Sequence, residues 1–153
     1  MRAIVQRLAE GCVVIDGKTV AECGKGLLVL VGVTHGDTEE DAVLLADKIA
    51  KMRIFSDEND KMNLSVTDVD GGIIVVPNFT LYASYRKGNR PDYLNSAHPD
   101  VAKPLFEFFA EYLKKYTEKV TKGVFGADMK VKITNDGPVT IPMDSELLRQ
   151  PKK

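Results

Sequence analysis

Two uninterrupted apolar runs constrain the fold of this chain more than any other feature. One is LLVLVGV at residues 27–33, and the other is GGIIVV at residues 71–76. Short, uniformly apolar runs rich in β-branched residues are typical of strands in the interior of a sheet. The longer run is also far too short to cross a membrane as a helix. The sequence therefore predicts two buried strands.

The segments around these runs predict two helices and further strands. Asp37, with Glu40 three residues later, is typical of a capping box at the start of a helix, and the apolar residues up to position 52 have helical spacing. A second helix is expected to start near Asp100, because Pro104 is tolerated only around a first turn. Further strands are expected at residues 2–8, 12–16, 19–23, 129–133 and 139–143.

This order of elements predicts one α+β domain over residues 1–153. We expect a largely antiparallel sheet, or barrel-like β core, with two main helices packed on it. The net charge of −1 excludes a strong global field for nucleic acid, so RNA contact requires a local patch. Cys12 and Cys23 lie in apolar strand-like runs and are interpreted as reduced, buried residues. With no pattern of a secretory signal, we expect a cytoplasmic protein.

The sequence lacks the usual constellations of catalytic and metal-binding residues. His35 and His98 are the only histidines, and both fall in expected loops far apart in the chain. No Gly-x-Ser-x-Gly motif is present, so the common serine hydrolase arrangement is excluded. We expect no metal or other cofactor. An enzyme with this sequence would have to act through positioning and backbone dipoles.

The segment PNFTLYA at residues 77–83 is a first candidate for function. The buried run ends at Pro77, and the chain continues with the polar residues Asn78 and Thr80. A bulge at the rim of the sheet would explain this pattern. Alternatively, backbone N–H groups at the strand end and the Thr80 hydroxyl point at a ligand.

The segment NDGP at residues 135–138 is a second candidate, because all four residue types avoid strand interiors. A tight turn between two strands would explain it. Alternatively it is a stiff main-chain finger that rejects a side chain by steric clash, since Gly137 allows close approach and Pro138 fixes the backbone.

Two groups of basic residues complete the candidates. The loop at residues 84–99 contains Arg86, Lys87 and Arg90, and six lysines lie between residues 114 and 132. Either group is explained by a solvated surface or by contact with phosphate groups.

These segments together resemble the D-aminoacyl-tRNA deacylase family over nearly the whole chain. The matching motifs occur in the family's order: MRAIVQR, GKGLLVLVGV, MRIFSDENDKMNLS, RKGNRP and GVFGADMKVKITNDGPVT. The resemblance implies a cytoplasmic homodimer that hydrolyses the ester between a D-amino acid and the 3′ end of tRNA. It also implies activity on glycine mischarged on alanine tRNA, with no membrane or DNA partner.

The resemblance also implies roles for single residues. Gly137 and Pro138, joined by a cis bond, would reach into the active site of the partner subunit and select against L-amino acids. Arg7 would help to hold this loop, and Asn135 begins the same motif. Lys87 and Arg90 would contact the tRNA.

The remaining implied roles concern the substrate ester and its adenosine. Backbone N–H groups of Phe79 and Thr80 would form an oxyanion hole next to Asn78, with water rather than Thr80 as the attacking group. Phe125 and Met129 would line the pocket for the terminal adenosine.

One departure from the family pattern leaves alternatives open. The family usually has Ser-Gln-x-Thr where this chain has Pro77, Asn78, Phe79 and Thr80. A related animal subgroup also has proline at the first position and is associated with a different substrate range. A deacylase with relaxed chirality that clears L-alanine or glycine from tRNA is therefore a second hypothesis. A non-catalytic tRNA-binding module is a third.

Overall fold

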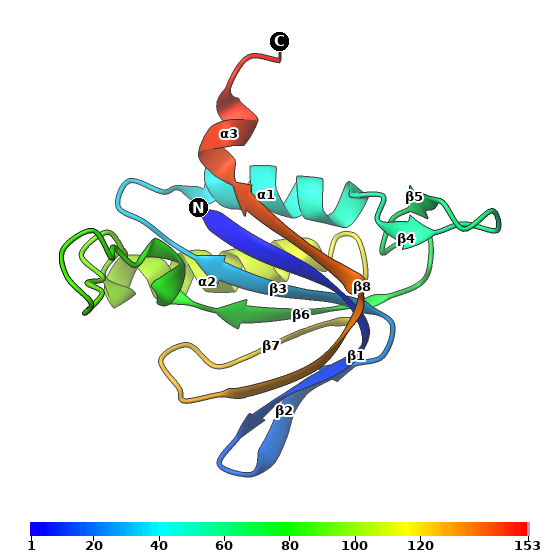
Figure 1. Ribbon diagram of the computed structural model, residues 1–153, viewed down its shortest axis with the longest axis horizontal. Coiled ribbons are helices and arrows are strands. Elements are labelled where there is room, and N and C mark those ends of the chain that lie inside the picture. Colours follow the sequence, from blue (N-terminus) through cyan, green and yellow to red (C-terminus); the bar gives the residue numbers. More distant parts are fainter. Residues whose placement is uncertain (153) are drawn as a thin grey trace.

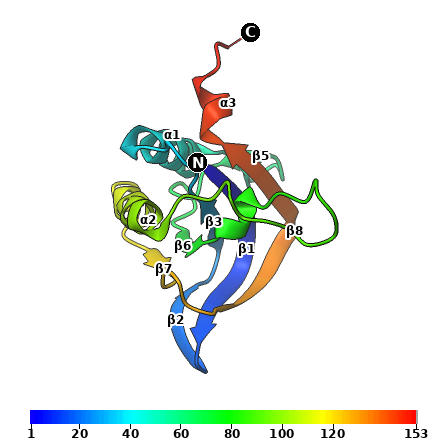
Figure 2. The ribbon, with the colours of Figure 1, turned by 90° about the vertical axis from the view of Figure 1, so that its left-hand side faces the viewer.

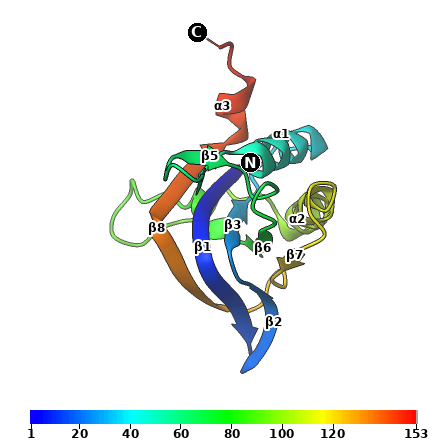
Figure 3. The ribbon, with the colours of Figure 1, turned by 90° about the vertical axis from the view of Figure 1, so that its right-hand side faces the viewer.

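Strand β1 (Arg2–Ile15) pairs with three other strands of the sheet in the computed structural model, which describes residues 1–152. Along one edge it pairs first with β3 (Gly26–Gly32) and then with β2 (Lys18–Cys23). Along its other edge it pairs with β8 (Lys130–Asp144) over almost its whole length. All three pairings are antiparallel, and Figure 3 shows β1 and β8 curving together.

The remaining two pairings of the sheet are parallel. β3 pairs with β6 (Gly72–Pro77), and β6 pairs with β7 (Val120–Lys122), which gives the order β2-β1-β3-β6-β7 with β8 on β1. Three of the five pairings in this sheet are antiparallel, so the expectation of a largely antiparallel sheet is confirmed, with a parallel part at β3, β6 and β7. The sheet curls into a nearly closed, barrel-like form (Figure 2). A separate small hairpin is formed by β4 (Phe55–Ser56) and β5 (Met62–Leu64).

The two expected main helices are present and lie side by side on one face of the sheet (Figure 1). They are α1 (Glu39–Lys51) and α2 (Pro99–Leu113). The short helix α3 (Ser145–Arg149) and the single 3₁₀ turn η1 (Phe79–Tyr82), which follows β6, were not predicted from the sequence. No helix within residues 1–152 is long and apolar enough to span a membrane.

The two apolar runs are central strands, as predicted, because both of their faces are covered. Alternate residues of β3, such as Leu27 and Val29, pack under the helices, whereas Leu28 packs into the hollow of the barrel. In β6, Ile73 faces the helices and Ile74 faces the hollow. Each of these side chains is at most 1% exposed, and full burial stabilises the fold by about 1.5–3 kcal/mol per side chain.

Three sequence-based boundaries were wrong. Residues 2–15 form one bent strand rather than two, and residues 130–144 also form one strand, so NDGP is not a tight turn between two strands. Helix α1 is capped by Thr38 and Asp41 rather than by Asp37 and Glu40, since Asp41 accepts a hydrogen bond from the Thr38 N–H at 2.9 Å. Asp37 instead accepts a hydrogen bond from the Met1 amino group at 2.7 Å.

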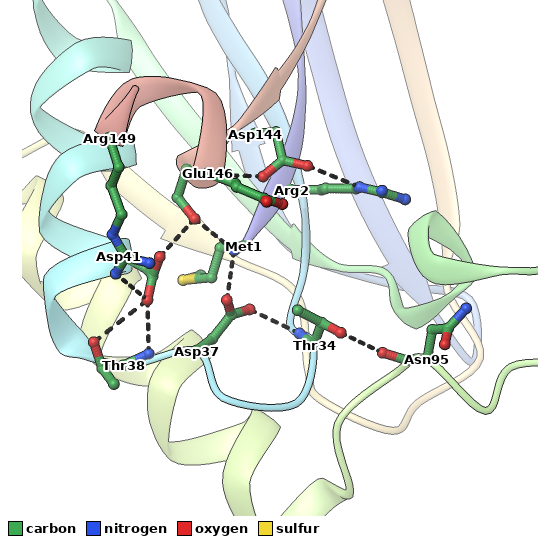
Figure 4. Close-up of polar contacts among 11 residues, drawn as sticks. Met1, Arg2, Thr34, Asp37, Thr38, Asp41, Asn95, Asp144, Glu146 and Arg149 are labelled. Atoms are coloured by element: carbon green, nitrogen blue, oxygen red, sulfur yellow. Dashed lines mark hydrogen bonds and ion pairs between the residues drawn. The ribbon is translucent and has the colours of Figure 1, made fainter. Parts of the chain in front are cut away.

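A buried polar cluster ties the start of β1 and the end of β8 to α1 (Figure 4). The Ser145 hydroxyl accepts from the Met1 amino group at 2.7 Å and donates to Asp41 at 2.6 Å. Arg149 contacts the other Asp41 oxygen at 2.8 Å. Burial raises the pKa of Asp41, but these partners outweigh burial and hold its pKa below the ordinary value. The cluster therefore stabilises a charged carboxylate inside the protein.

Gly26 provides a test of how closely β3 and β6 approach. A Cβ atom at this position would lie 2.0 Å from the Gly72 carbonyl oxygen, whereas one at Gly24 would meet nothing within 4 Å. We expect Gly26→Ala to lower the free energy of unfolding by about 1–3 kcal/mol or more, because backbone cannot move away as a side chain can. Gly24→Ala should change it by less than about 0.5 kcal/mol. Urea denaturation checks both, and equal effects would contradict the packing described.

Candidate active site

An apolar cavity of about 560 Å³ opens where β3 and β6 end. It lies between these strand ends, the start of α2 and the loop that leads into β8. Four of the residues singled out from the sequence line it together: Asn78, Phe79, Phe125 and Met129. Its volume is that of a typical small-molecule site. A larger hollow of about 700 Å³ beside β1 and β2 is lined by none of the predicted site residues.

The 3₁₀ turn η1 presents backbone donors beside this cavity. The first N–H groups of a helix have no partner inside it, and here they belong to Phe79 and Thr80. The Thr80 N–H donates to the Asn78 side-chain oxygen at 3.2 Å, and the Thr80 hydroxyl donates to the same oxygen. Among the hydrogen bonds of residues 1–152, none uses the Phe79 N–H. Of these two backbone N–H groups, that of Phe79 is therefore the one available to a ligand.

The NDGP segment is a wide bulge rather than a chain reversal. Asn135 pairs with Leu8 of β1 and Thr140 pairs with Gln6, so residues 136–139 stand opposite Arg7 alone. The Gly137–Pro138 bond is cis and both residues are exposed. Residues 136–139, called the corner below, leave the sheet. The strand continues in the same direction on both sides of them.

Arg7 and Asn135 fix the corner from below. The Arg7 guanidinium donates to the Asp136 carbonyl at 3.1 Å and to the buried Ile54 carbonyl at 2.8 Å. The Asn135 amide donates to the carbonyls of Arg7 and Val139, at 2.9 and 3.0 Å. Gly137 has φ = +127°, which L side chains rarely adopt. The corner is therefore a main-chain projection anchored on both sides.

The corner and the cavity lie at opposite ends of β3. Arg7, below the corner, pairs with Leu27, whereas the cavity begins at Val31. Leu27 and Val31 are four residue steps apart along the strand, which is roughly 13 Å. In Figure 1 the middle of β8 lies to the right, and the ends of β3 and β6 point to the left. No corner residue lines the cavity of its own chain.

The basic residues fall into two different settings. Lys87 and Arg90 project from a loop whose ends are joined by two hydrogen bonds between Ser84 and Asp92, and neither forms an ion pair within residues 1–152. Four of the six lysines at residues 114–132 pair with an acidic side chain, namely Lys114, Lys119, Lys122 and Lys130. The second group is therefore mostly a solvated surface with ion pairs.

Other cavity residues were not predicted from the sequence. Tyr93, Ser96 and His98 line it from the segment before α2, and Phe106 lines it from the helix. These residues follow no sequence motif, because they come from a loop and from one face of a helix. Only Tyr93, an aromatic residue in a polar loop, could have indicated a binding site from the sequence. Cys12 and Cys23 are half-buried free thiols rather than buried ones, and burial raises the pKa of Cys23.

The family model described as D-Tyr-tRNA(Tyr) deacylase matches residues 4–144. The chain belongs to this family. A protein of Flavobacterium johnsoniae named D-aminoacyl-tRNA deacylase is 56% identical over 95% of this chain and 98% of its own length. One of the same name from Chloroflexus aurantiacus is 51% identical over 100% of this chain and 96% of its length. The resemblance noted from the sequence is thereby confirmed.

A solved structure confirms the family fold. It is titled c-Myc DNA Unwinding Element Binding Protein, is 37% identical, and superposes with a TM-score of 0.89 over 94% of this chain and 98% of its own. The α+β architecture with a curled sheet is therefore that of the family.

Arg7→Met tests the anchoring of the corner. The variant leaves the Ile54 and Asp136 carbonyls without a charged donor, and Arg7 is only 11% exposed. We expect the free energy of unfolding to fall by about 1.5–3 kcal/mol. Arg53→Met removes an exposed arginine that lies between α1 and β4 and donates to Asn63 at the surface, and it should cost less than about 0.5 kcal/mol. If urea denaturation gives the same loss for both variants, Arg7 does not anchor the corner.

Proposed function

We propose that this protein hydrolyses the ester that joins a D-amino acid to the 3′ end of tRNA. The observation that carries the proposal is the cavity lined by Asn78, Phe79, Phe125 and Met129, with an open backbone donor at Phe79 beside it. The names of the family relatives, D-aminoacyl-tRNA deacylase, support the same activity.

The cavity is suited to the terminal adenosine. Its walls are aliphatic and aromatic, and the rings of Phe106 and Phe125 lie 6.3 Å apart at its inner side. Such walls pack against the faces of a base, while the ribose with its ester faces the strand ends. Phe125 and Met129 are therefore the proposed adenosine contacts.

The ester carbonyl is placed against the start of η1. Its oxygen would accept the Phe79 N–H and compete with Asn78 for the Thr80 N–H. Fixed backbone donors at a developing oxyanion stabilise the tetrahedral intermediate, which is the largest single term in many acyl transfers. Asn78 positions this turn, because its side chain caps η1.

Water is the proposed attacking group. The Thr80 hydroxyl donates its proton to the Asn78 amide oxygen, and an amide is not a base that could activate the hydroxyl. The 2′-hydroxyl of the RNA lies next to the ester and would assist proton transfer. The released products are the free D-amino acid and reusable tRNA.

Selection against L-amino acids is assigned to the corner of a second copy of this chain. The corner cannot serve the cavity of its own chain at the opposite end of β3. In a homodimer with the active site at the interface, Gly137 and Pro138 would meet an L side chain with rigid main chain and leave a D side chain free. Glycine has no side chain to reject and would also be cleaved from alanine tRNA.

Relaxed chirality is the second candidate function. Pro77 lines the cavity and has no N–H group to offer the substrate, unlike the serine usual in the family. An enzyme of this kind would also remove L-alanine from tRNA. The proposed D-selectivity rests on the anchored corner, which the Pro77 replacement does not touch.

Deacylation assays separate these functions. With EDTA present, we expect rapid loss of D-Tyr-tRNA and no loss of L-Tyr-tRNA or L-Ala-tRNA above the uncatalysed rate. Gly137→Ala brings a methyl group within 3.2 Å of Arg7 and should reduce the D-to-L selectivity by about tenfold or more. Gly17→Ala, a matched change at another positive φ, should not. Equal cleavage of L-Ala-tRNA would favour the second function, and tRNA binding without cleavage the binding module.

Thr80→Ala separates the roles of the backbone and the hydroxyl. The substitution keeps the N–H group and removes only the hydroxyl, so kcat for D-Tyr-tRNA should stay within about tenfold of the parent value. Loss of all activity in a variant with an unchanged unfolding midpoint would instead make Thr80 the nucleophile.

A further inference from the structure

The mouth of the cavity carries an exposed aromatic pair that the steps above do not use. The rings of Phe79 and Tyr93 lie 5.0 Å apart in an edge-to-face arrangement, and both residues line the cavity. Phe79 is nevertheless 57% exposed and Tyr93 40% exposed. These two side chains therefore form the rim, with apolar ring surface open to solvent.

The backbone beneath this pair is held in place. The Ser96 hydroxyl donates to the Phe79 carbonyl at 2.7 Å, and the Thr34 hydroxyl donates to the Asn95 carbonyl at 2.5 Å. A His35 ring nitrogen lies 2.8 Å from the Leu94 carbonyl. The Ala97 N–H donates to the Val33 carbonyl at 2.9 Å. The rim is thus preorganised, which lowers the entropy lost when a ligand stacks on it.

Positive charge lies on the loop that connects the two aromatic residues along the chain. The loop between Ser84 and Asp92 projects Arg86, Lys87 and Arg90 into solvent, and none of them has a carboxylate partner within residues 1–152. The nearby Asp92 carboxylate accepts the Leu94 N–H. Exposed aromatic rings beside unpaired cations are the elements with which proteins bind single-stranded nucleic acid.

We propose that Phe79 and Tyr93 form a stacking subsite for the nucleotide that precedes the terminal adenosine, with its phosphate toward the basic loop. This subsite rests on the function proposed above, which places the adenosine inside the cavity. An RNA strand that leaves the cavity must cross its rim. Phe79 and Tyr93 are the aromatic residues that both line the cavity and are exposed to solvent. In every tRNA the preceding nucleotide is a cytidine, whose base offers a flat face for stacking.

Binding of the dinucleotide CpA tests this subsite without requiring hydrolysis. The reference ligand is the methyl ester of adenosine 5′-monophosphate, which has the same single negative charge and lacks the cytidine. By calorimetry we expect the parent protein to bind CpA about tenfold more tightly than the reference. Tyr93→Leu should bring the ratio of the two dissociation constants close to one. Tyr93→Phe, which keeps the ring, should preserve it.

Tyr85→Leu is the matched control, because Tyr85 is 81% exposed in the same region and does not line the cavity. It should keep the parent ratio. The subsite is overturned if the parent binds both ligands equally or binds neither, or if Tyr93→Leu keeps the ratio. It is also overturned if Tyr93→Leu weakens self-association in sedimentation, because the rim would then be covered by a second copy. A preserved CpA preference without cleavage of D-Tyr-tRNA would contradict the proposed function and leave the subsite standing.

Discussion

Both halves of β8 pair with the same strand, and this constraint sets the geometry of the corner. Asn135 and Thr140 are held by Leu8 and Gln6 of β1, so the residues between them have no strand partner and must leave the sheet. Arg7, the single residue opposite them, supplies the charged donor that holds the Asp136 carbonyl. A projection built on two paired strands is stiff, and stiffness is what a filter based on steric rejection requires.

The other part of the proposed site follows from the parallel half of the sheet. Because β3 and β6 run in the same direction, they end together, and the cavity and η1 lie where they end. The catalytic elements proposed there are the backbone N–H groups of Phe79 and Thr80, which the replacements at Pro77 and Asn78 leave in place. Because the corner and the cavity lie at opposite ends of β3, the proposed site would be complete only with a second copy of the chain.

The sequence predicted the parts of this protein that depend on local pattern. The central strands follow from their apolar runs, the helices from spacing, and the cavity residues Phe79, Phe125 and Met129 from family motifs. It could not predict long-range pairing: that residues 130–144 form one strand is decided by β1, more than a hundred residues away. Nor did it predict Tyr93, whose place at the cavity depends on hydrogen bonds from its loop to Thr34, which follows β3, and to Phe79, which follows β6.

Mixed dimers test the central claim that the corner of one subunit filters the substrate in the cavity of the other. One subunit carries Gly137→Ala, and its partner carries an intact corner with Phe125→Trp, whose larger ring obstructs the proposed adenosine contact. Dimers containing one of each, isolated through two affinity tags, have a single open cavity. We predict that this cavity, facing an intact corner, hydrolyses D-Tyr-tRNA and rejects L-Tyr-tRNA, although Gly137→Ala homodimers accept both. L-Tyr-tRNA cleavage by the mixed dimers at the rate per open cavity of Gly137→Ala homodimers would contradict the account.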